Sequence, residues 1–428
     1  MRATTACAAL LALALVIGSS RSLPLEENRK PRSEEGIVSY SGYKLFRTDV
    51  PLPQLPVVDS LDSSDGVDVW SWRYNDQRLE YELDVLTPPD AEQQVKQVFS
   101  DYQLNYQEVI EDLQSAINLE LGDKESFWNR PGHPMTWERY HSTEDRKKYP
   151  AVSQTVLHHG YLHRNRYPHF KNISKSSTAL AALSSKRGMG VPCTAMFILH
   201  RLVEFNWEDH EIINEFDWYI LPLANPDGYE YTRHHDRLWR KTRSINPEMP
   251  GCVGVDANRN FGYRWMEGGS SSNPCSDIYA GPTSFSEPET RAIRDFLLKV
   301  YLSIHAYSQM WMLPWGFSQE RPENYNDMYE VALNATAALE KSYGTKYRIG
   351  SIPELLYVAT GGSGDYALGA VGIPYSFSLE LRDLGRYGFI LPREQIMPTA
   401  NETYVGIKAM AQAVFEKLQV SNNTNTGA

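Results

Sequence analysis

Mostly apolar runs that end at reactive polar side chains constrain this chain more than any other feature. Residues 216–223, 300–304 and 375–379 each have the character of a buried strand. The first leads into Asn225-Pro226-Asp227-Gly228, the second ends at His305 and the third ends at Glu380. The sequence therefore predicts buried strands that place polar side chains where the strands end, which is where open α/β sheets bind ligands.

Length and composition set broad limits. A chain of 428 residues, with 42% hydrophobic and 22% charged residues, can hold one small and one large folded domain. Its net charge of −11, with no basic stripe to offset it, argues against nucleic acid as a partner.

The N-terminus has the pattern of a secretory signal peptide, over residues 1–22. Arg2 gives the positive start, residues 8–17 form an apolar run too short to span a bilayer, and residues 18–20 are small, as a cleavage site requires. The alternative, a buried N-terminal helix, is disfavoured because polar, proline-containing sequence follows at once. We expect a secreted, extracellular protein with no membrane segment.

Secretion makes the cysteines informative, because disulfides persist outside the cell. Cys7 leaves with the signal peptide. Cys252 and Cys275 lie 23 residues apart and flank a Gly/Ser-rich loop, which predicts a disulfide between them. Cys193 is then left without a disulfide partner in the sequence.

A small α/β unit is expected near the N-terminus. Residues 43–46, 67–70 and 81–86 are expected to be strands, the last two because they alternate like half-buried strands. Pro88-Pro89-Asp90 then starts a helix with Val95, Val98 and Phe99 at helical spacing.

Five motifs, taken in order, resemble the zinc metallocarboxypeptidases of the pancreatic A/B type. They lie at residues 225–228, 237–243, 256–260, 303–309 and 379–383. The resemblance implies an α/β catalytic domain over residues 135–420, with a mixed, mostly parallel eight-stranded sheet flanked by helices. It also implies one zinc ion per chain, and peptide or protein C-termini as substrates.

The segment before this domain resembles the family's activation propeptide, a small open-sandwich α/β domain, over residues 38–122. The resemblance includes its Ile-Glu-Asp-x-Gln signature at residues 110–114. A propeptide caps the active site until a protease cuts the linker, here residues 121–134, where Lys124 and Arg130 suit a trypsin-like protease. The alternative is a permanent accessory domain.

The resemblance assigns roles to residues of the reaction. His305 matches the third zinc ligand, and Glu380 matches the general base and acid that takes a proton from the bound water. Arg240 matches the donor that stabilises the oxyanion. The alternative for Glu380 is a strand-end carboxylate paired with Arg382.

Further matches concern substrate binding. Asn258 and Arg259 match the clamp for the free C-terminal carboxylate, a task that suits the bidentate guanidinium. Tyr357 matches a mobile tyrosine that closes over substrate, and Tyr307 and Phe389 match aromatics at the pocket edge.

The specificity pocket is expected to contain Ile352, Ala359, Gly364 and Ser378. The B type of the family has an aspartate and the A type an apolar residue at the position of Gly364, whereas glycine leaves room. Since the matched positions carry no acid, we expect apolar or aromatic C-terminal residues. Asp365 matches a structural aspartate.

The family's other two zinc ligands form a His-x-x-Glu pair, and the matching stretch, residues 184–193, contains no histidine and no acid. Three other groups of residues in the sequence carry ligand-type side chains. His141 with Glu144, and His200 with Glu204, match scaffold positions, whereas a cluster upstream could form a different zinc site without a carboxylate: His158, His159, His163 and His169.

The family pattern is lost between residues 157 and 193 and returns abruptly at Thr194, and an inner strand of the sheet is expected to be missing there. We therefore hypothesise a shifted reading frame in this segment and skipped segments near residues 145 and 298. Two functions remain open. One is a secreted zinc-dependent carboxypeptidase zymogen, and the other is an inactive secreted homologue or defective gene model that at most binds peptide C-termini.

Overall fold

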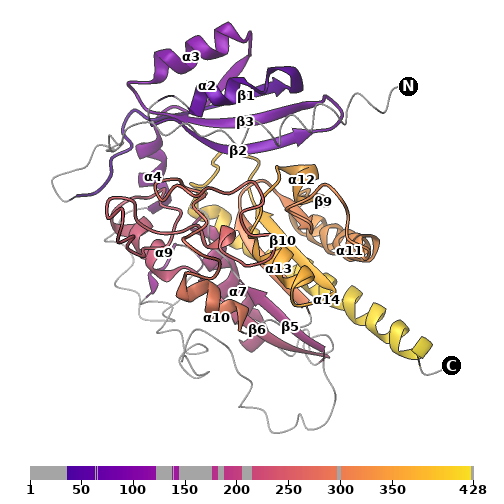
Figure 1. The fold of residues 1–428 in the computed structure, drawn as a ribbon. Helices are drawn as coiled ribbons and strands as arrows, with labels where there is room; N and C mark the ends of the chain where they lie inside the picture. The colour runs from indigo at the N-terminus through magenta and orange to yellow at the C-terminus, as the bar shows by residue number, and fades with distance from the viewer. Residues whose placement is uncertain are drawn as a thin grey trace.

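The computed structural model describes residues 36–121 apart from 63 and 65, together with residues 137, 139–143, 176–181, 188–204, 215–295 and 300–425. A small unit with its own sheet stands above a larger unit built around a second sheet (Figure 1). The predicted signal peptide, the linker residues Lys124 and Arg130, and the histidine cluster at 158–169 lie outside the described residues.

The small unit is a four-stranded antiparallel sheet in the order β2-β3-β1-β4. One face of the sheet packs Phe46 and Leu83 against Val95 and Phe99 of a helix. The predicted strands and helix are present, and the first strand is longer than expected. The elements are β1 (Lys44–Pro51), η1 (Leu52–Gln54), α2 (Val57–Asp62), β2 (Asp68–Asn75), β3 (Glu80–Thr87), α3 (Glu92–Asp101), β4 (Tyr106–Ile110) and α4 (Leu113–Leu121).

The large sheet has the order β6-β5-β7-β10-β8-β9. All neighbours are parallel except β10 and β8, so the predicted mixed, mostly parallel class is confirmed, and the described residues contribute six strands to it. The strands are β5 (Ser176–Ala181), β6 (Phe216–Leu221), β7 (Val300–Ala306), β8 (Met310–Leu313), β9 (Arg348–Ser351) and β10 (Tyr375–Leu381).

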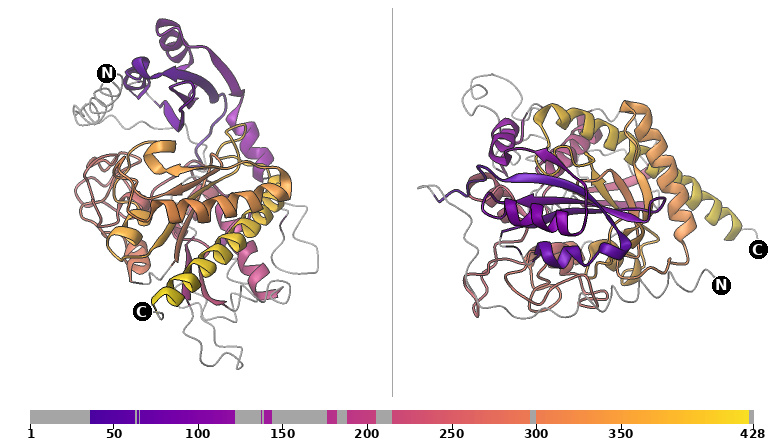
Figure 2. Two further views of the ribbon diagram at one scale, coloured as in Figure 1. Left: turned by 90° about the vertical axis from the view of Figure 1, so that its right-hand side faces the viewer. Right: turned by 90° about the horizontal axis from the view of Figure 1, so that it is seen from above.

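The two central strands, β7 and β10, are buried along their whole length, but their faces differ. Alternate residues of a strand share a face. Leu302 and Phe377 are on the face that packs in the main hydrophobic core with three long helices, α7 (Gly190–Glu204), α11 (Tyr325–Tyr343) and α14 (Ile396–Asn425). The left view of Figure 2 shows α11 and α14 side by side across the sheet. His305 and Glu380 are on the other face.

The expectation that an inner strand is missing is wrong for residues 176–181. They form β5, which pairs in parallel with β6 on one side and β7 on the other. Its sequence, Ser-Ser-Thr-Ala-Leu-Ala, lacks the apolar run typical of a central strand. Two flanking strands offer backbone hydrogen bonds to any chain between them, so neighbours can outweigh intrinsic preference.

The remaining helices connect the strands. Asn225 caps α9 (Pro226–His234), because its side chain accepts a hydrogen bond from Gly228 N at 2.9 Å, and Pro226 occupies the first turn. Among the described residues no helix is long and apolar enough to cross a membrane. The others are η2 (Ala257–Arg259), α10 (Pro288–Arg294), α12 (Ile352–Leu355), α13 (Ser363–Gly369) and η3 (Arg393–Gln395).

Candidate active site

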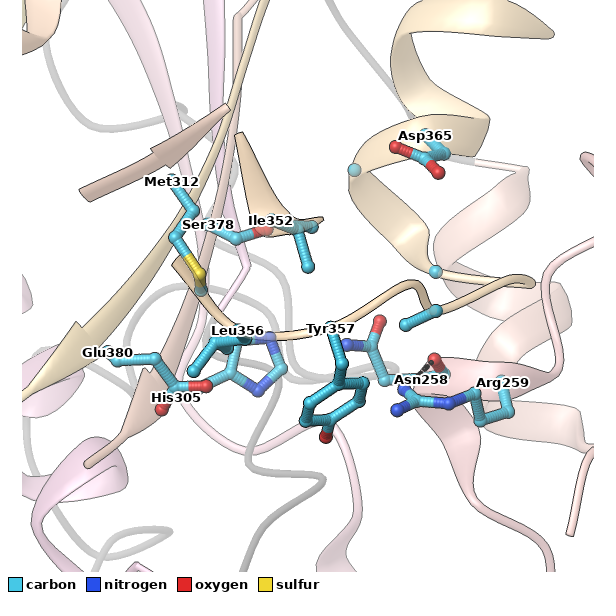
Figure 3. Close-up of a pocket in the computed structure, with 13 residues that line it drawn as sticks. Asn258, Arg259, His305, Met312, Ile352, Leu356, Tyr357, Asp365, Ser378 and Glu380 are labelled. Atoms are coloured by element: carbon cyan, nitrogen blue, oxygen red, sulfur yellow. Dashed lines mark hydrogen bonds between the residues drawn. The ribbon is translucent and has the colours of Figure 1, made fainter. Parts of the chain in front are cut away.

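A pocket opens on the sheet face that carries His305 and Glu380 (Figure 3). It brings together most of the predicted site residues, although they come from four separate parts of the sequence. The lining consists of Asn258, Arg259, His305, Met312, Ile352, Leu356, Tyr357, Ala359, Gly362, Gly364, Asp365, Ser378 and Glu380. Among the described residues, Arg240, Tyr307 and Phe389 are not part of this lining.

His305 and Glu380 are direct neighbours across the β7–β10 pairing, one residue before each strand ends. Both are 2% exposed. The Nε2 atom of His305 lies 2.6 Å from the hydroxyl of Ser303, two residues back on the same face of β7. This contact fixes the orientation of the imidazole ring through one of its two nitrogens.

Asp256, which is 0% exposed, organises the opposite side of the pocket. Its carboxylate accepts two hydrogen bonds from the Arg240 guanidinium and lies 4.0 Å from Nη1 of Arg259. Burial lowers the pKa of Arg240, but Asp256, together with Tyr357 and Asp277, raises it, and the pKa lies above its ordinary value. The carboxylate also caps η2 by accepting from Asn258 N at 3.1 Å.

Asn258 and Arg259 are held by backbone and hydroxyl groups. The Asn258 side-chain oxygen accepts from Ser363 N at 3.1 Å and from its hydroxyl at 3.2 Å, which leaves the amide nitrogen as a donor. Arg259 donates to Gly269 O at 2.9 Å and to Asn258 O at 2.9 Å. Gly361, at φ +69°, lies so close that a Cβ there would stand 2.2 Å from Arg259 O.

The deep part of the pocket has apolar walls and a floor at Gly364. Met312 and Leu356 contribute to the walls. Asp365 also borders the pocket, but its carboxylate accepts hydrogen bonds from the backbone amides of Gly316 and Phe317. Burial raises the pKa of Asp365 to about 7. The geometry fits the expectation of a structural aspartate.

The small N-terminal unit, expected to be the propeptide, lies over one edge of the site. Tyr307, two residues after His305, donates from its hydroxyl to Asp84 of β3 at 2.8 Å, and Asp84 also accepts from Arg47 and Arg73. Phe389 packs edge-on against Tyr307 and against Trp70 of β2. The two predicted pocket-edge aromatics are therefore covered by the propeptide.

A second attachment lies at the end of the propeptide. Glu120 on α4 accepts two hydrogen bonds of 2.6 Å from Arg237, and both side chains are buried. Arg237 also donates to Phe389 O at 2.9 Å. The helix that immediately precedes the predicted cleavage linker is thus anchored to the large unit through a buried ion pair.

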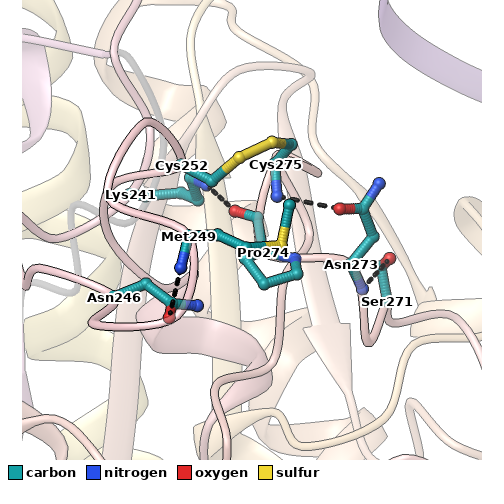
Figure 4. The surroundings of a disulfide bond; sticks show 8 residues. All are labelled: Lys241, Asn246, Met249, Cys252, Ser271, Asn273, Pro274 and Cys275. Carbon is teal, nitrogen blue, oxygen red and sulfur yellow. Dashed lines mark hydrogen bonds between the residues drawn. A yellow bond between two sulfur atoms is a disulfide. The ribbon is translucent and has the colours of Figure 1, made fainter. Parts of the chain in front are cut away.

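The predicted disulfide between Cys252 and Cys275 is present (Figure 4). The loop that it closes contains the clamp residues Asn258 and Arg259. Lys241, next to Arg240, donates to Pro274 O at 2.7 Å, so the loop also contacts the arginine motif. Cys193 is buried in α7.

Zinc in such a site needs three protein ligands and an open position. His305 and Glu380 are the described side chains at the expected place, and the described residues contain no group of three or more metal-ligating side chains. Gly188, the first described residue of the stretch expected to carry His-x-x-Glu, packs against Ala306, the residue after His305: a Cβ at Gly188 would stand 2.9 Å from Ala306 Cβ. The described residues therefore do not fit a complete zinc site.

The other histidines expected to be scaffold have structural surroundings. His141 is buried, and its backbone oxygen accepts from the Tyr229 hydroxyl at 2.8 Å. His200 on α7 lies with its ring centroid 5.4 Å from that of Trp137. Glu144 lies outside the described residues.

Comparisons with known proteins agree with this architecture. The family model described as zinc carboxypeptidase matches residues 191–406, and that described as carboxypeptidase activation peptide matches residues 53–120. The chain therefore belongs to the zinc carboxypeptidases, a family of metallocarboxypeptidase hydrolases, and it has the organisation of a carboxypeptidase zymogen.

The relatives include proteins named carboxypeptidase A and proteins named carboxypeptidase B. Carboxypeptidase B of Astacus astacus is 47% identical over 229 residues, covering 52% of this chain and 76% of the relative. Carboxypeptidase A4 of Mus musculus is 33% identical and covers 89% of this chain and 95% of the relative. The crystal structure of carboxypeptidase A from Helicoverpa armigera has a TM-score of 0.76 at 27% identity, covering 87% of this chain and 98% of that one.

Sequence reasoning missed several residues that support the site. Asp256 stands in the quoted motif at 256–260, and a carboxylate two residues before a predicted carboxylate clamp is a signal that could have been used. Ser303 could have been inferred from its i, i+2 spacing to His305 on a predicted strand. Asp84 and Glu120 carry no local signal for their contacts with the large unit, because Tyr307 and Arg237 are more than a hundred residues away.

Proposed function

We propose that this chain is a secreted zymogen whose mature domain removes C-terminal residues, with apolar or aromatic side chains favoured, from peptides. The observation that carries the proposal is the convergence of Asn258, Arg259, Gly364 and Glu380 on one pocket. A clamp for a free carboxylate beside a buried carboxylate suits cleavage at a chain end.

Each residue has a task in the proposal. The guanidinium of Arg259 and the amide nitrogen of Asn258 bind the terminal carboxylate. Arg240, held in place by Asp256, faces the carbonyl that becomes an oxyanion, and Glu380 carries a proton between water and the leaving amine. Tyr357 covers the bound residue from the pocket wall.

The proposal includes activation by cleavage in the linker at 121–134, by a trypsin-like protease acting at Lys124 or Arg130. It is supported by the contacts of Asp84 and Glu120, because both tie the propeptide to residues beside the pocket. Removing the propeptide would uncover Tyr307 and Phe389 for substrate.

Among the described residues the zinc site is incomplete, and this favours a second candidate. A chain with one imidazole at the metal position would bind peptide C-termini without hydrolysing them. Zinc content and hydrolysis of a blocked dipeptide ending in Phe, measured on the same trypsin-treated sample, separate the two. About one zinc per chain with chelator-sensitive turnover supports the hydrolase. No zinc and no turnover, with the dipeptide still bound, supports the binder.

A further inference from the structure

The floor of the pocket carries hydroxyl groups where a buried sheet is normally apolar. Alternate residues of β10 share a face, so the face that presents Glu380 also presents Ser378 and, one step deeper, Ser376. Buried hydroxyls are nearly always hydrogen-bonded, so each of these requires a partner.

The two serines differ in this respect. Ser376 is 0% exposed and donates to Gly364 O at 2.8 Å, so its hydroxyl is satisfied within the protein. Ser378 is 8% exposed and lines the pocket, and within the described part of the chain its hydroxyl makes no hydrogen bond. The Ser378 hydroxyl can therefore donate and accept hydrogen bonds, and it faces the space that a bound side chain would fill.

Gly364 keeps this hydroxyl accessible. A Cβ at position 364 would stand 3.3 Å from Ser378 Oγ and 3.5 Å from Ser376 Oγ. Any larger side chain there would therefore cover Ser378. The glycine adds depth to the pocket and also a polar group at its end.

The walls above this floor are apolar, with Met312, Ile352 and Leu356 around the entering side chain (Figure 3). An aromatic ring suits these walls. A phenylalanine ring would bury the Ser378 hydroxyl without a partner, whereas a tyrosine ring would bring a hydroxyl to it. Sites that hydrogen-bond a substrate hydroxyl discriminate strongly against the analogue lacking it.

We infer that the pocket selects peptides ending in tyrosine over those ending in phenylalanine. Ser378 would form a hydrogen bond with the phenol hydroxyl, and Gly364 leaves the Ser378 hydroxyl exposed to the pocket. The inference rests on the proposed function, because it assumes that the clamp holds a C-terminal carboxylate above this pocket. It narrows the substrate class from aromatic to hydroxylated aromatic side chains.

The test is equilibrium binding of N-benzoylglycyl-tyrosine and N-benzoylglycyl-phenylalanine to the trypsin-cleaved chain, measured by calorimetry. We expect the tyrosine ligand to bind roughly tenfold tighter, as one satisfied buried hydroxyl allows. Ser378→Ala and Gly364→Ala should both bring the ratio close to one, the first by removing the hydroxyl and the second by covering it. Ser376→Ala, which removes a satisfied hydroxyl from the same face, should keep the ratio.

Phenylalanine binding as tightly as tyrosine in the unaltered chain overturns the inference, as does a ratio that survives both Ser378→Ala and Gly364→Ala. Tighter binding of N-benzoylglycyl-lysine also overturns it, since Asp365 would then face the ligand. Binding of the same ligands as C-terminal amides distinguishes failure of this inference from failure of the proposed carboxylate clamp. If acids still bind better than amides, only the inference fails, whereas equal binding of acids and amides contradicts the proposed clamp as well.

Discussion

The pocket has two sides: a clamp side, with Arg240, Asn258 and Arg259, and a metal side, with His305. The described residues supply a full set of side chains for the clamp side but not for the metal side. On the clamp side, Asp256 holds Arg240 and caps the turn that presents Asn258 and Arg259. On the metal side, His305 is anchored by Ser303, but the described residues include no second and third ligand beside it.

The difference follows from where the parts lie in the sequence. The clamp comes from one short turn at residues 256–260, which packs against residues 361–364 from another part of the described chain. A three-ligand zinc site would combine His305 with two ligands from a separate stretch, expected at residues 184–193. A change in the chain after β5 can therefore remove the metal side while the clamp side keeps its geometry.

The largest effect is expected from Asp256→Ala, which tests whether the clamp side depends on one buried carboxylate. Removing it leaves the Arg240 guanidinium buried without its partner, which costs about 3–5 kcal/mol of unfolding free energy. Denaturant unfolding of the purified chain measures this loss. Asp256→Asn is the matched control, because it keeps the shape and the cap to Asn258. A loss below about 1 kcal/mol in Asp256→Ala would show that the clamp is held by other contacts.

Opening the disulfide tests how far the loop that carries the clamp residues depends on the covalent link. Replacing Cys252 and Cys275 together by serine frees a loop with a sequence separation of 23, and should lower the free energy of unfolding by about 3 kcal/mol. The metal side has no such link among its described residues. An unchanged melting temperature under non-reducing conditions would contradict this account.

Arg259→Lys tests the clamp directly. Lysine keeps the charge but loses the two-pronged geometry and the hydrogen bond to Gly269 O. We expect a loss of about 1.5–3 kcal/mol in binding a dipeptide acid, roughly 10- to 150-fold, with little change for the dipeptide amide. Calorimetric titration with both ligands measures the effect. Equal losses for acid and amide would mean that Arg259 supports the pocket without touching the carboxylate.

The effect that is smallest when expressed per pH unit concerns Asp365, beside the pocket floor. The pKa of Asp365 is raised to about 7 from 3.8, so its protonated form stabilises the fold. This contribution is fully present below about pH 4 and is lost as the pH rises towards 7, with a slope of up to about 1.4 kcal/mol per pH unit. Unfolding free energies across this range should fall more steeply for the unaltered chain than for Asp365→Asn. Parallel curves would contradict the assignment.

The sequence predicted much of the fold, because strongly patterned segments decide their own structure. The strands ending at His305 and Glu380, and the helix with Val95 and Phe99, follow from apolar periodicity alone. The strand β5 could not be predicted, because Ser176–Ala181 forms it through pairing with β6 and β7, not through its own pattern.

The candidate site shows the same division between residues that can be assigned from the sequence and residues whose contacts form only on folding. Residues inside motifs, such as Asn258 and Arg259, could be assigned from the sequence. Asp84 and Glu120 could not, since their importance comes from partners brought close only by folding. The assigned roles of Arg240, Tyr307, Tyr357 and Phe389 remain predictions that binding experiments can test.

The most direct test of the central claim compares a blocked dipeptide acid with its amide on the trypsin-cleaved chain, with and without a zinc chelator. A self-contained clamp predicts that the acid binds at least about tenfold tighter than the amide and that the chelator leaves this ratio unchanged. Equal binding of acid and amide, or a ratio that disappears with the chelator, would contradict the claim that the clamp side is complete without the metal side.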